Sequence, residues 1–173
     1  PANLTSIGEM YLEDLNSDGS LDIFLYTPSF PGQGRIHFGD GIGGIDSIQN
    51  PGLILDDDGI MLQDVNNDGH IDLLYDLNYV RTALNDGNGN FTYVSIFDNY
   101  GVLLDFSGDI DNDNDIDLLS YSSTVDNRYT IVENDGNGNF TEGAIFILPD
   151  PSPSIQGHYN VFLEDIDSDG DME

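Results

Sequence analysis

The sequence predicts an all-β protein made of tandem four-stranded antiparallel blades. Three observations support this: an acidic nine-residue pattern occurs four times, short apolar segments flank each copy, and helical periodicity is absent over any useful window. The pattern reads DLNSDGSLD from Asp14, DVNNDGHID from Asp64, DIDNDNDID from Asp109 and DIDSDGDME from Asp165, so that successive copies begin 50, 45 and 56 residues apart. Internal repetition at this period is typical of propeller blades, solenoids and arrays.

The same period sets the expected domain organisation. The segment PDPSPS at 149–154 is the best candidate for a linker, because proline is tolerated where no backbone N–H is needed. We expect repeat 1 over residues 1–50, repeat 2 over 51–98, repeat 3 over 99–148, and a linker with the first hairpin of an incomplete repeat 4 over 149–173.

Two hairpins are expected in each repeat. The acidic pattern lies between apolar segments, as in MYLED before it and LDIFLY after it, and should be the tip of the first hairpin. A glycine-rich turn follows 21 to 25 residues after the start of each of the first three patterns: NDGNGNFT begins at Asn85 and at Asn134, and GDGIGGID begins at Gly39. An Asp-Gly turn between apolar runs is a strong hairpin signal. Each repeat should therefore contain about four short strands.

The charge balance excludes several classes of function. The formal net charge is −30, there is no lysine, and the only cationic side chains besides histidine are Arg35, Arg81 and Arg128. Nucleic acids are held by basic patches, which are missing, and no apolar run approaches the roughly 20 residues that cross a bilayer. The arginines stand five to seven residues before the aspartate of each glycine turn, which favours one structural ion pair or carbonyl contact per repeat over substrate recognition.

The acidic pattern has the oxygen spacing of a calcium loop. Positions 1, 3, 5 and 9 offer side-chain oxygen and position 7 offers its main-chain oxygen, and calcium takes six to eight oxygen ligands. The side-chain candidates are Asp14, Asn16, Asp18 and Asp22; Asp64, Asn66, Asp68 and Asp72; Asp109, Asp111, Asp113 and Asp117; and Asp165, Asp167, Asp169 and Glu173. The main-chain candidates are Ser20, His70, Asp115 and Asp171. We predict about one Ca²⁺ per loop.

An EF-hand and sites for magnesium or zinc fit the acidic pattern less well. An EF-hand needs helices and a glutamate at position 12, where Leu25, Tyr75 and Ser120 stand. Magnesium prefers a rigid octahedron with retained waters, and zinc prefers nitrogen and sulfur ligands. Position 6 is glycine except at Asn114, and asparagine tolerates the left-handed backbone region better than most residues. Solvated acidic turns that bind no metal remain the alternative, which four regularly spaced copies disfavour.

These motifs resemble those of the FG-GAP/VCBS repeat family, whose units combine a DxDxDGxxD loop, an apolar strand and a later LxNDGxGxF turn. LLYDLNYVRTALNDGNGNFT from Leu73 and YTIVENDGNGNFT from Tyr129 carry the resemblance, which extends over nearly the whole chain. It implies four-stranded antiparallel blades, calcium in the loops, distant similarity to integrin α-subunit heads, and extracellular adhesive, lectin-like or accessory roles.

The arrangement of the blades stays open at this point. Propellers of the family usually close with about seven blades and should need four or more, whereas three full repeats and part of a fourth are found here. The segment could be cut from a longer propeller, several chains could complete one ring, or the blades could stack in an open row that neighbouring copies continue as a fibre. We favour a piece of a longer array.

The predicted function is that of a secreted or cell-surface calcium-binding repeat protein with a structural or adhesive role, since free calcium is abundant outside cells. Its expected partners are neighbouring copies or repeats, with glycans and cell-surface proteins as further candidates, and neither nucleic acid nor a membrane span is expected. A carbohydrate-binding module is the alternative, in which exposed tyrosines stack on sugar rings. The candidates for such stacking are Tyr79, Tyr93, Tyr100 and Tyr159.

We predict no enzymatic activity. The acids left over at 56–58 have no nearby base, and His37, His70 and His158 share no spacing typical of a triad or a zinc site. N-x-T sequons occur at Asn3, Asn90 and Asn139; they are either glycosylation candidates in a secreted eukaryotic protein or accidental products of the NGNFT turn.

Overall fold

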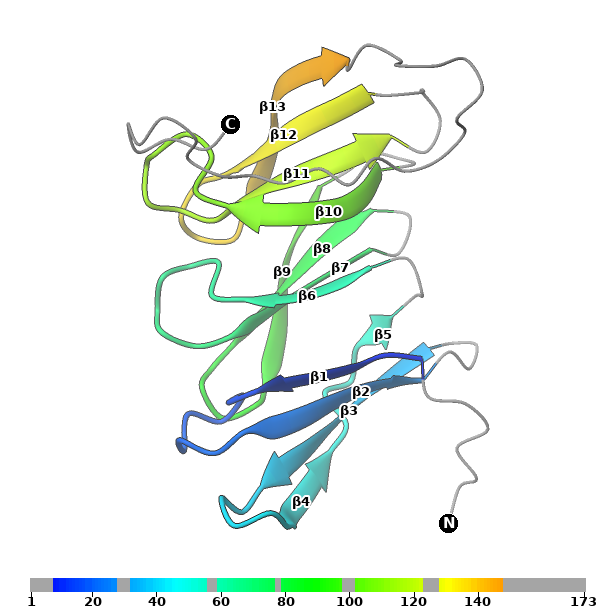
Figure 1. The fold of residues 1–173 in the computed structure, drawn as a ribbon, viewed down its shortest axis with the longest axis vertical. Helices are drawn as coiled ribbons and strands as arrows, with labels where there is room; N and C mark the ends of the chain where they lie inside the picture. The colour runs from blue at the N-terminus through cyan, green and yellow to red at the C-terminus, as the bar shows by residue number, and fades with distance from the viewer. Residues whose placement is uncertain are drawn as a thin grey trace.

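The computed structural model describes residues 8–27, 32–55, 59–76, 79–97, 102–122 and 128–147. Within these ranges the regular structure consists of thirteen β-strands in three sheets, and every paired neighbour is antiparallel (Figure 1). The prediction of an all-β chain of tandem four-stranded antiparallel blades is confirmed. No helix in these ranges has the length and apolarity needed to cross a membrane.

Each sheet is a meander whose strands pair in chain order. The first sheet contains β1 (Met10–Glu13), β2 (Asp22–Thr27), β3 (Gly32–Gly39) and β4 (Ile45–Gln49). The second contains β6 (Ile60–Gln63), β7 (Asp72–Asp76), β8 (Val80–Asn85) and β9 (Phe91–Phe97). The third contains β10 (Val102–Gly108), β11 (Asp117–Ser122), β12 (Arg128–Asn134) and β13 (Phe140–Ile147). A short strand, β5 (Ile54–Leu55), lies in the range expected for repeat 2 but pairs with β3 and so extends the first sheet.

The three sheets stack face to face in a row along the long axis of the molecule (Figure 1). The core between the first and second sheets contains Phe24, Ile36 and Phe38 from the first and Leu73 and Tyr75 from the second. Successive strand residues point to opposite faces, so a strand buried on both faces can serve two cores. Each sheet therefore depends on its neighbours for burial, as in other repeat proteins.

A second core joins the next pair of sheets in the same way. It contains Leu74, Val80 and Phe97 from the second sheet and Leu118 and Val132 from the third. Because Leu74 follows Leu73 directly, the two leucines serve opposite cores.

The glycine turns fit closely against the preceding sheet. A Cβ on Gly89, in the turn of the second sheet, would lie 2.5 Å from Cζ of Phe38 in the first. One on Gly138, in the third sheet, would lie 3.2 Å from Cδ2 of Leu84 in the second. Both glycines also have positive φ, 75° and 77°, which an L side chain rarely adopts. The turns thus need glycine for backbone conformation and for packing between sheets.

The strand register corrects the expectation of one equivalent arginine per repeat. Arg35 and Arg81 occupy equivalent positions. The preceding strand begins with an aspartate in both sheets, and the third residue after that aspartate is the one that pairs with the arginine. In the third sheet that residue is Ser120 and its partner is Thr130, while Arg128 lies two residues earlier. The range of five to seven residues seen in the sequence concealed this shift. Arg128 therefore does not occupy the strand position that Arg35 and Arg81 share.

Candidate metal centres

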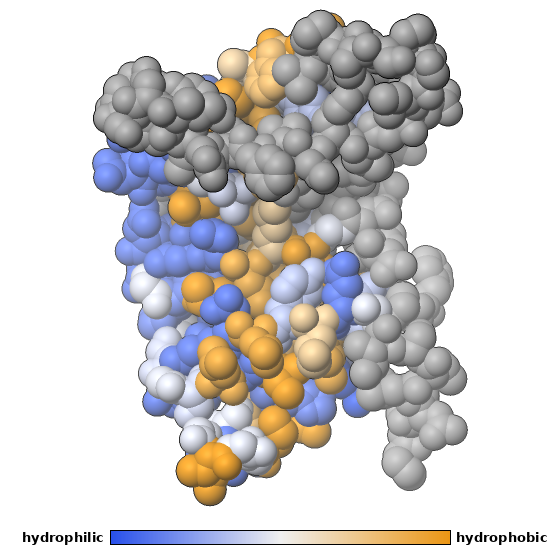
Figure 2. All heavy atoms as spheres, in the orientation of Figure 1, coloured by the Kyte–Doolittle hydropathy of each residue, from blue (hydrophilic) through white to orange (hydrophobic). Residues whose placement is uncertain are grey.

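The first three acidic loops connect β1 to β2, β6 to β7 and β10 to β11, and they project from the same side of the stack, at the left in Figure 1. Hydrophilic residues gather on this side in Figure 2. We call them the first, second and third loops, at 14–22, 64–72 and 109–117. The fourth predicted loop, with Asp165, Asp167, Asp169, Asp171 and Glu173, lies outside the described residues.

Each loop turns sharply at two left-handed residues. Position 6 has φ of 87° at Gly19 and Gly69 and of 73° at Asn114, so the asparagine adopts the conformation expected of it from the sequence. Position 4 is also left-handed, with φ of 57° at Ser17, 57° at Asn67 and 63° at Asn112, which was not expected from the sequence. Asparagine at two of these three positions was the available signal.

The carboxylate at position 1 closes each loop. In the first loop Asp14 accepts the N–H groups of Asp18 at 3.1 Å and Gly19 at 2.8 Å. Asp64 accepts the corresponding two N–H groups at 3.2 and 2.9 Å, and Asp109 accepts them at 3.0 and 3.1 Å. The three loops share one hydrogen-bond plan.

Position 5 repeats as well, since its carboxylate accepts the N–H of position 7. The N···O distances are 2.7 Å from Ser20 to Asp18, 2.9 Å from His70 to Asp68 and 2.9 Å from Asp115 to Asp113. This bond holds the backbone N–H of position 7, the residue whose carbonyl is the predicted main-chain ligand.

The carboxylate at position 9 is the buried anchor of each loop. Asp22, Asp72 and Asp117 have no exposed surface. One oxygen of each accepts the N–H of position 2, at 2.9 Å from Leu15 and at 3.1 Å in the second and third loops. The other oxygen accepts the N–H of the first residue of the glycine turn, at 2.8, 2.7 and 2.9 Å in the three sheets. Loop and glycine turn are therefore tied together at one carboxylate.

Burial makes these anions costly without a cation. Desolvation raises the pKa of Asp72 to about 6, against the lowering effect of the N–H groups of Asn85 and Val65. Desolvation also raises the pKa of Asp117. Exposed Asp18 differs, because the hydrogen bond from Asn16 lowers its pKa. A bound cation would stabilise the charged form of the buried carboxylates.

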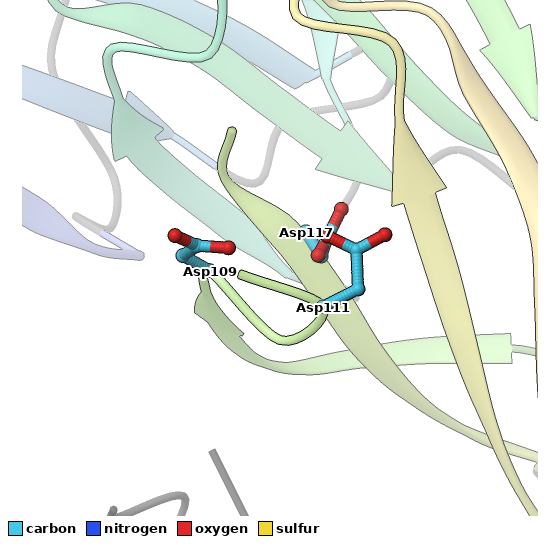
Figure 3. A group of neighbouring side chains, drawn as sticks. All are labelled: Asp109, Asp111 and Asp117. Carbon is cyan, nitrogen blue, oxygen red and sulfur yellow. The ribbon is translucent and has the colours of Figure 1, made fainter. Parts of the chain in front are cut away.

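The third loop brings three carboxylates together. Oxygens of Asp109, Asp111 and Asp117 all lie within 4.8 Å of one another, and Figure 3 shows their side chains gathered around the loop and the start of β11. The first two loops have asparagine at position 3, where the amide of Asn16 donates to Asp18 at 2.8 Å and that of Asn66 donates to Asp68 at 2.8 Å. Aspartate at position 3 thus makes the group of anionic oxygens denser in the third loop than in the first two.

The donor set fits calcium. Side-chain oxygens at positions 1, 3, 5 and 9 and the main-chain carbonyl at position 7 supply oxygen alone, as this hard cation requires. Among the side chains of the described loops, the only nitrogen heterocycle is His70, whose Nδ1 lies 2.8 Å from Oγ of Ser17. When bound, the ion would neutralise the like charges that the loop collects. Asp14, Asp64 and Asp109 would hold it together with the other side-chain candidates of their loops.

Neighbouring loops also contact each other directly. Position 4 of one loop meets position 7 of the next, through Ser17 and His70 at 2.8 Å and through Asn67 and Asp115 at 2.8 Å. The acidic side of the stack is therefore a connected row of loops rather than three isolated sites.

Several further residues singled out in the sequence are placed by the structure. Tyr93 on β9 is 44% exposed and Tyr79 is half-buried, whereas Tyr100 and Tyr159 lie outside the described residues. Residues 56–58, Asn3 and His158 lie outside them as well.

The two described sequon asparagines belong to the hydrogen-bonding of the glycine turns. Nδ2 of Asn90 donates to Asp86 at 2.9 Å, and Nδ2 of Asn139 donates to Asp135 at 3.0 Å.

Sequence reasoning missed the first residue of the glycine turn as part of the metal-loop structure. Asn85 and Asn134 are buried, and their side chains reach into the loop of the preceding sheet. The repetition of NDGNGN in two repeats was the signal, which we attributed to the turn alone.

A row of four-stranded antiparallel sheets, each with an oxygen-rich loop at its first hairpin, defines a tandem-repeat β protein with candidate cation sites. The model of the FG-GAP-like repeat matches residues 109–173, which begin at the third loop. This part of the chain is similar to an FG-GAP-like repeat, which confirms the predicted resemblance, and the first two sheets share its loop and turn pattern. Comparisons with curated proteins and with solved structures found no match.

Proposed function

We propose that this is an extracellular calcium-binding repeat protein with a structural or adhesive role, and that it forms part of a longer tandem array. One observation supports the calcium assignment above the rest: three loops bury the carboxylates of Asp22, Asp72 and Asp117 completely on a single hydrogen-bond plan. Solvated acidic turns have no reason to bury a charge. The extracellular location follows from the calcium such loops would require.

The outer face of the first sheet supports the array. Met10 and Leu12 are 60% and 53% exposed there. Their equivalents in the second sheet, Ile60 and Leu62, pack in the core against the first sheet, and Ile60 is only 7% exposed. Hydrophobic residues are visible at the lower end of Figure 2, where the first sheet lies. An apolar face of this kind suits another sheet of the same type.

Calcium titration tests the proposal. The chelator-treated full chain, titrated by calorimetry, should bind about one Ca²⁺ per acidic loop and should bind Mg²⁺ much more weakly. Asp109→Asn should remove one site, whereas Asp46→Asn, at an exposed acid on β4 outside the loops, should remove none. No calcium uptake, or equal losses in the two variants, would reject the metal assignment.

Sedimentation can test the array. The calcium-loaded chain should self-associate through the exposed apolar face, and Leu12→Glu should weaken that association without changing the number of calcium ions bound. Association unaffected by this substitution would show that another surface is used.

A carbohydrate-binding role is the second candidate, with Tyr93 as the one clearly exposed tyrosine among its described candidates. Binding to a glycan array that is lost in Tyr93→Ala and in excess chelator would favour this role over self-association.

A further inference from the structure

The side chain of Asn85 joins two neighbouring metal loops. Its Nδ2 donates to the carbonyl of Leu15 in the first loop at 2.9 Å and to the carbonyl of Ile71 in the second loop at 3.0 Å. Its Oδ1 accepts the N–H groups of Gly87 at 3.2 Å and Gly89 at 3.1 Å. Both donors and both acceptor sites of the amide are therefore used, and the residue is 3% exposed.

Asn134 repeats this arrangement one sheet further on. Its Nδ2 donates to the carbonyl of Val65 in the second loop at 2.7 Å and to that of Ile116 in the third loop at 3.1 Å. Its Oδ1 accepts the N–H of Gly138 at 3.1 Å. Because the arrangement occurs in two independent copies, it is a property of the repeat and not an accidental contact.

These contacts complete a continuous path between the buried carboxylates. The peptide N–H of Leu15 binds Asp22, while the carbonyl of the same residue accepts Asn85. The backbone N–H of Asn85 then binds Asp72 at 2.7 Å, and the other oxygen of Asp72 accepts the N–H of Val65 at 3.1 Å.

The second half of the path repeats the first. The carbonyl of Val65 accepts Nδ2 of Asn134, whose own N–H binds Asp117 at 2.9 Å. The path therefore runs through all three described loops, and each position-9 carboxylate is one of its members.

We propose that Asn85 and Asn134 are positioning residues that couple calcium binding between neighbouring loops, an inference that rests on the proposed function. A cation that orders one position-9 carboxylate also holds the backbone N–H of position 2, and so restrains the residue whose carbonyl orients the asparagine of the next sheet. That asparagine presents its N–H to the next position-9 carboxylate. The first ion thus supplies part of the ordering that the second would otherwise require, which gives positive cooperativity.

The first sheet lacks this connection on its own turn. Gly39 occupies the position of Asn85 and donates its N–H to Asp22 at 2.8 Å, but it has no side chain with which to reach another loop. Glycine at this position is therefore compatible with the folded sheet, which makes Asn85→Gly a suitable test substitution. Asn88→Gly is its matched control, because exposed Asn88 directs its side-chain donor to Asp86 within the same turn.

The experiment disables one loop and measures its neighbour in the full chain. Asp14→Asn weakens the first loop, and calcium binding at the second loop is followed by the NMR shift of the Gly69 amide. Loss of the first site should lower the calcium affinity of the second loop by about fivefold or more, because fivefold is the lower end of typical coupling between sites. Asn85→Gly should reduce the coupling between the two loops clearly, although the contact between Ser17 and His70 remains, whereas Asn88→Gly should keep the coupling at its native strength.

Each outcome decides between a coupling role and a merely structural one. If Asp14→Asn leaves second-loop affinity unchanged in the otherwise native chain, or if Asn85→Gly leaves the coupling at its native strength, the proposal is overturned. A chain that takes up calcium independently at each loop rejects coupling alone, while a chain that takes up none rejects the proposed function as well. Should Asn85→Gly prevent folding, Asn134→Gly provides a second test between the second and third loops.

Discussion

Replacing Asp72 by asparagine should destabilise the protein strongly in calcium and much less in chelator. In the native chain its two oxygens accept the N–H groups of Val65 at 3.1 Å and Asn85 at 2.7 Å, and its side chain has no exposed surface. Asparagine keeps the shape but presents an NH₂ group to one of these donors. One buried N–H then lacks an acceptor, which costs about 1–3 kcal/mol.

Charge makes the loss depend on calcium. The pKa of Asp72 is raised from 3.8 to about 6, chiefly by desolvation and further by repulsion from Asp68 and Asp64. Its contribution to stability is therefore full below pH 3.8 and lost as the pH rises through about 6. At pH 7.5 without calcium, the neutral asparagine avoids this penalty, which offsets the lost hydrogen bond. With calcium at about 100 times its dissociation constant, the variant also forgoes about 2.7 kcal/mol of binding, so its loss in calcium should exceed its loss in chelator by about that amount.

Urea denaturation followed by circular dichroism, in saturating calcium and in excess chelator at pH 7.5, measures both losses. Asp46→Asn, at an exposed acid on β4, should behave alike in the two solutions. If Asp72→Asn costs the same with and without calcium, the second loop does not hold the ion and the reasoning from burial is wrong.

Three further predictions test the joins between sheets and the metal. Excess chelator should lower the melting temperature by at least roughly 8–16 °C relative to calcium at ten times the dissociation constant, because the three described loops alone, at about 1.4 kcal/mol each, contribute about 4 kcal/mol. An unchanged calorimetric transition would contradict this. Gly89→Ala should lower the free energy of unfolding by about 2–5 kcal/mol in chemical denaturation, since a Cβ would lie 2.5 Å from Phe38. The control Gly43→Ala should cost only about 1–2 kcal/mol, because Gly43 also has positive φ but a Cβ there would have no atom within 4 Å. Phe24→Ala should cost about 3–5 kcal/mol by the same measurement, because its fully buried ring fills the core between the first two sheets, and a loss below about 1 kcal/mol would show that core to be unimportant.

The strands and loops that could be predicted from the sequence depend on interactions between residues that are close together along the chain. Short apolar segments and turn-forming sequences act over a few residues, so the hairpins around the loops at 14–22 and 64–72 could be predicted without knowledge of their neighbours. The acid spacing likewise identified the aspartate at position 9 as a candidate ligand, although its complete burial became apparent only in the folded chain.

Features that depend on distant partners could not be predicted in this way. Asn85 bonds to a carbonyl 70 residues earlier, and no local pattern distinguishes that contact from ordinary turn chemistry. The pairing of β5 with β3 depends on strand register, as does the shifted position of Arg128 in the third sheet. Strand register is set when the strands pair in a sheet. Residue spacing counted along the chain therefore did not predict these two features.

The placement of every described acidic loop on one side of the stack has a mechanical consequence. If these loops bind calcium as proposed, removal of the ions would leave repelling carboxylates along that side of the stack. Repulsion on one side alone would bend the row of sheets and would not lengthen it. Calcium would therefore govern the curvature of the row as well as its rigidity.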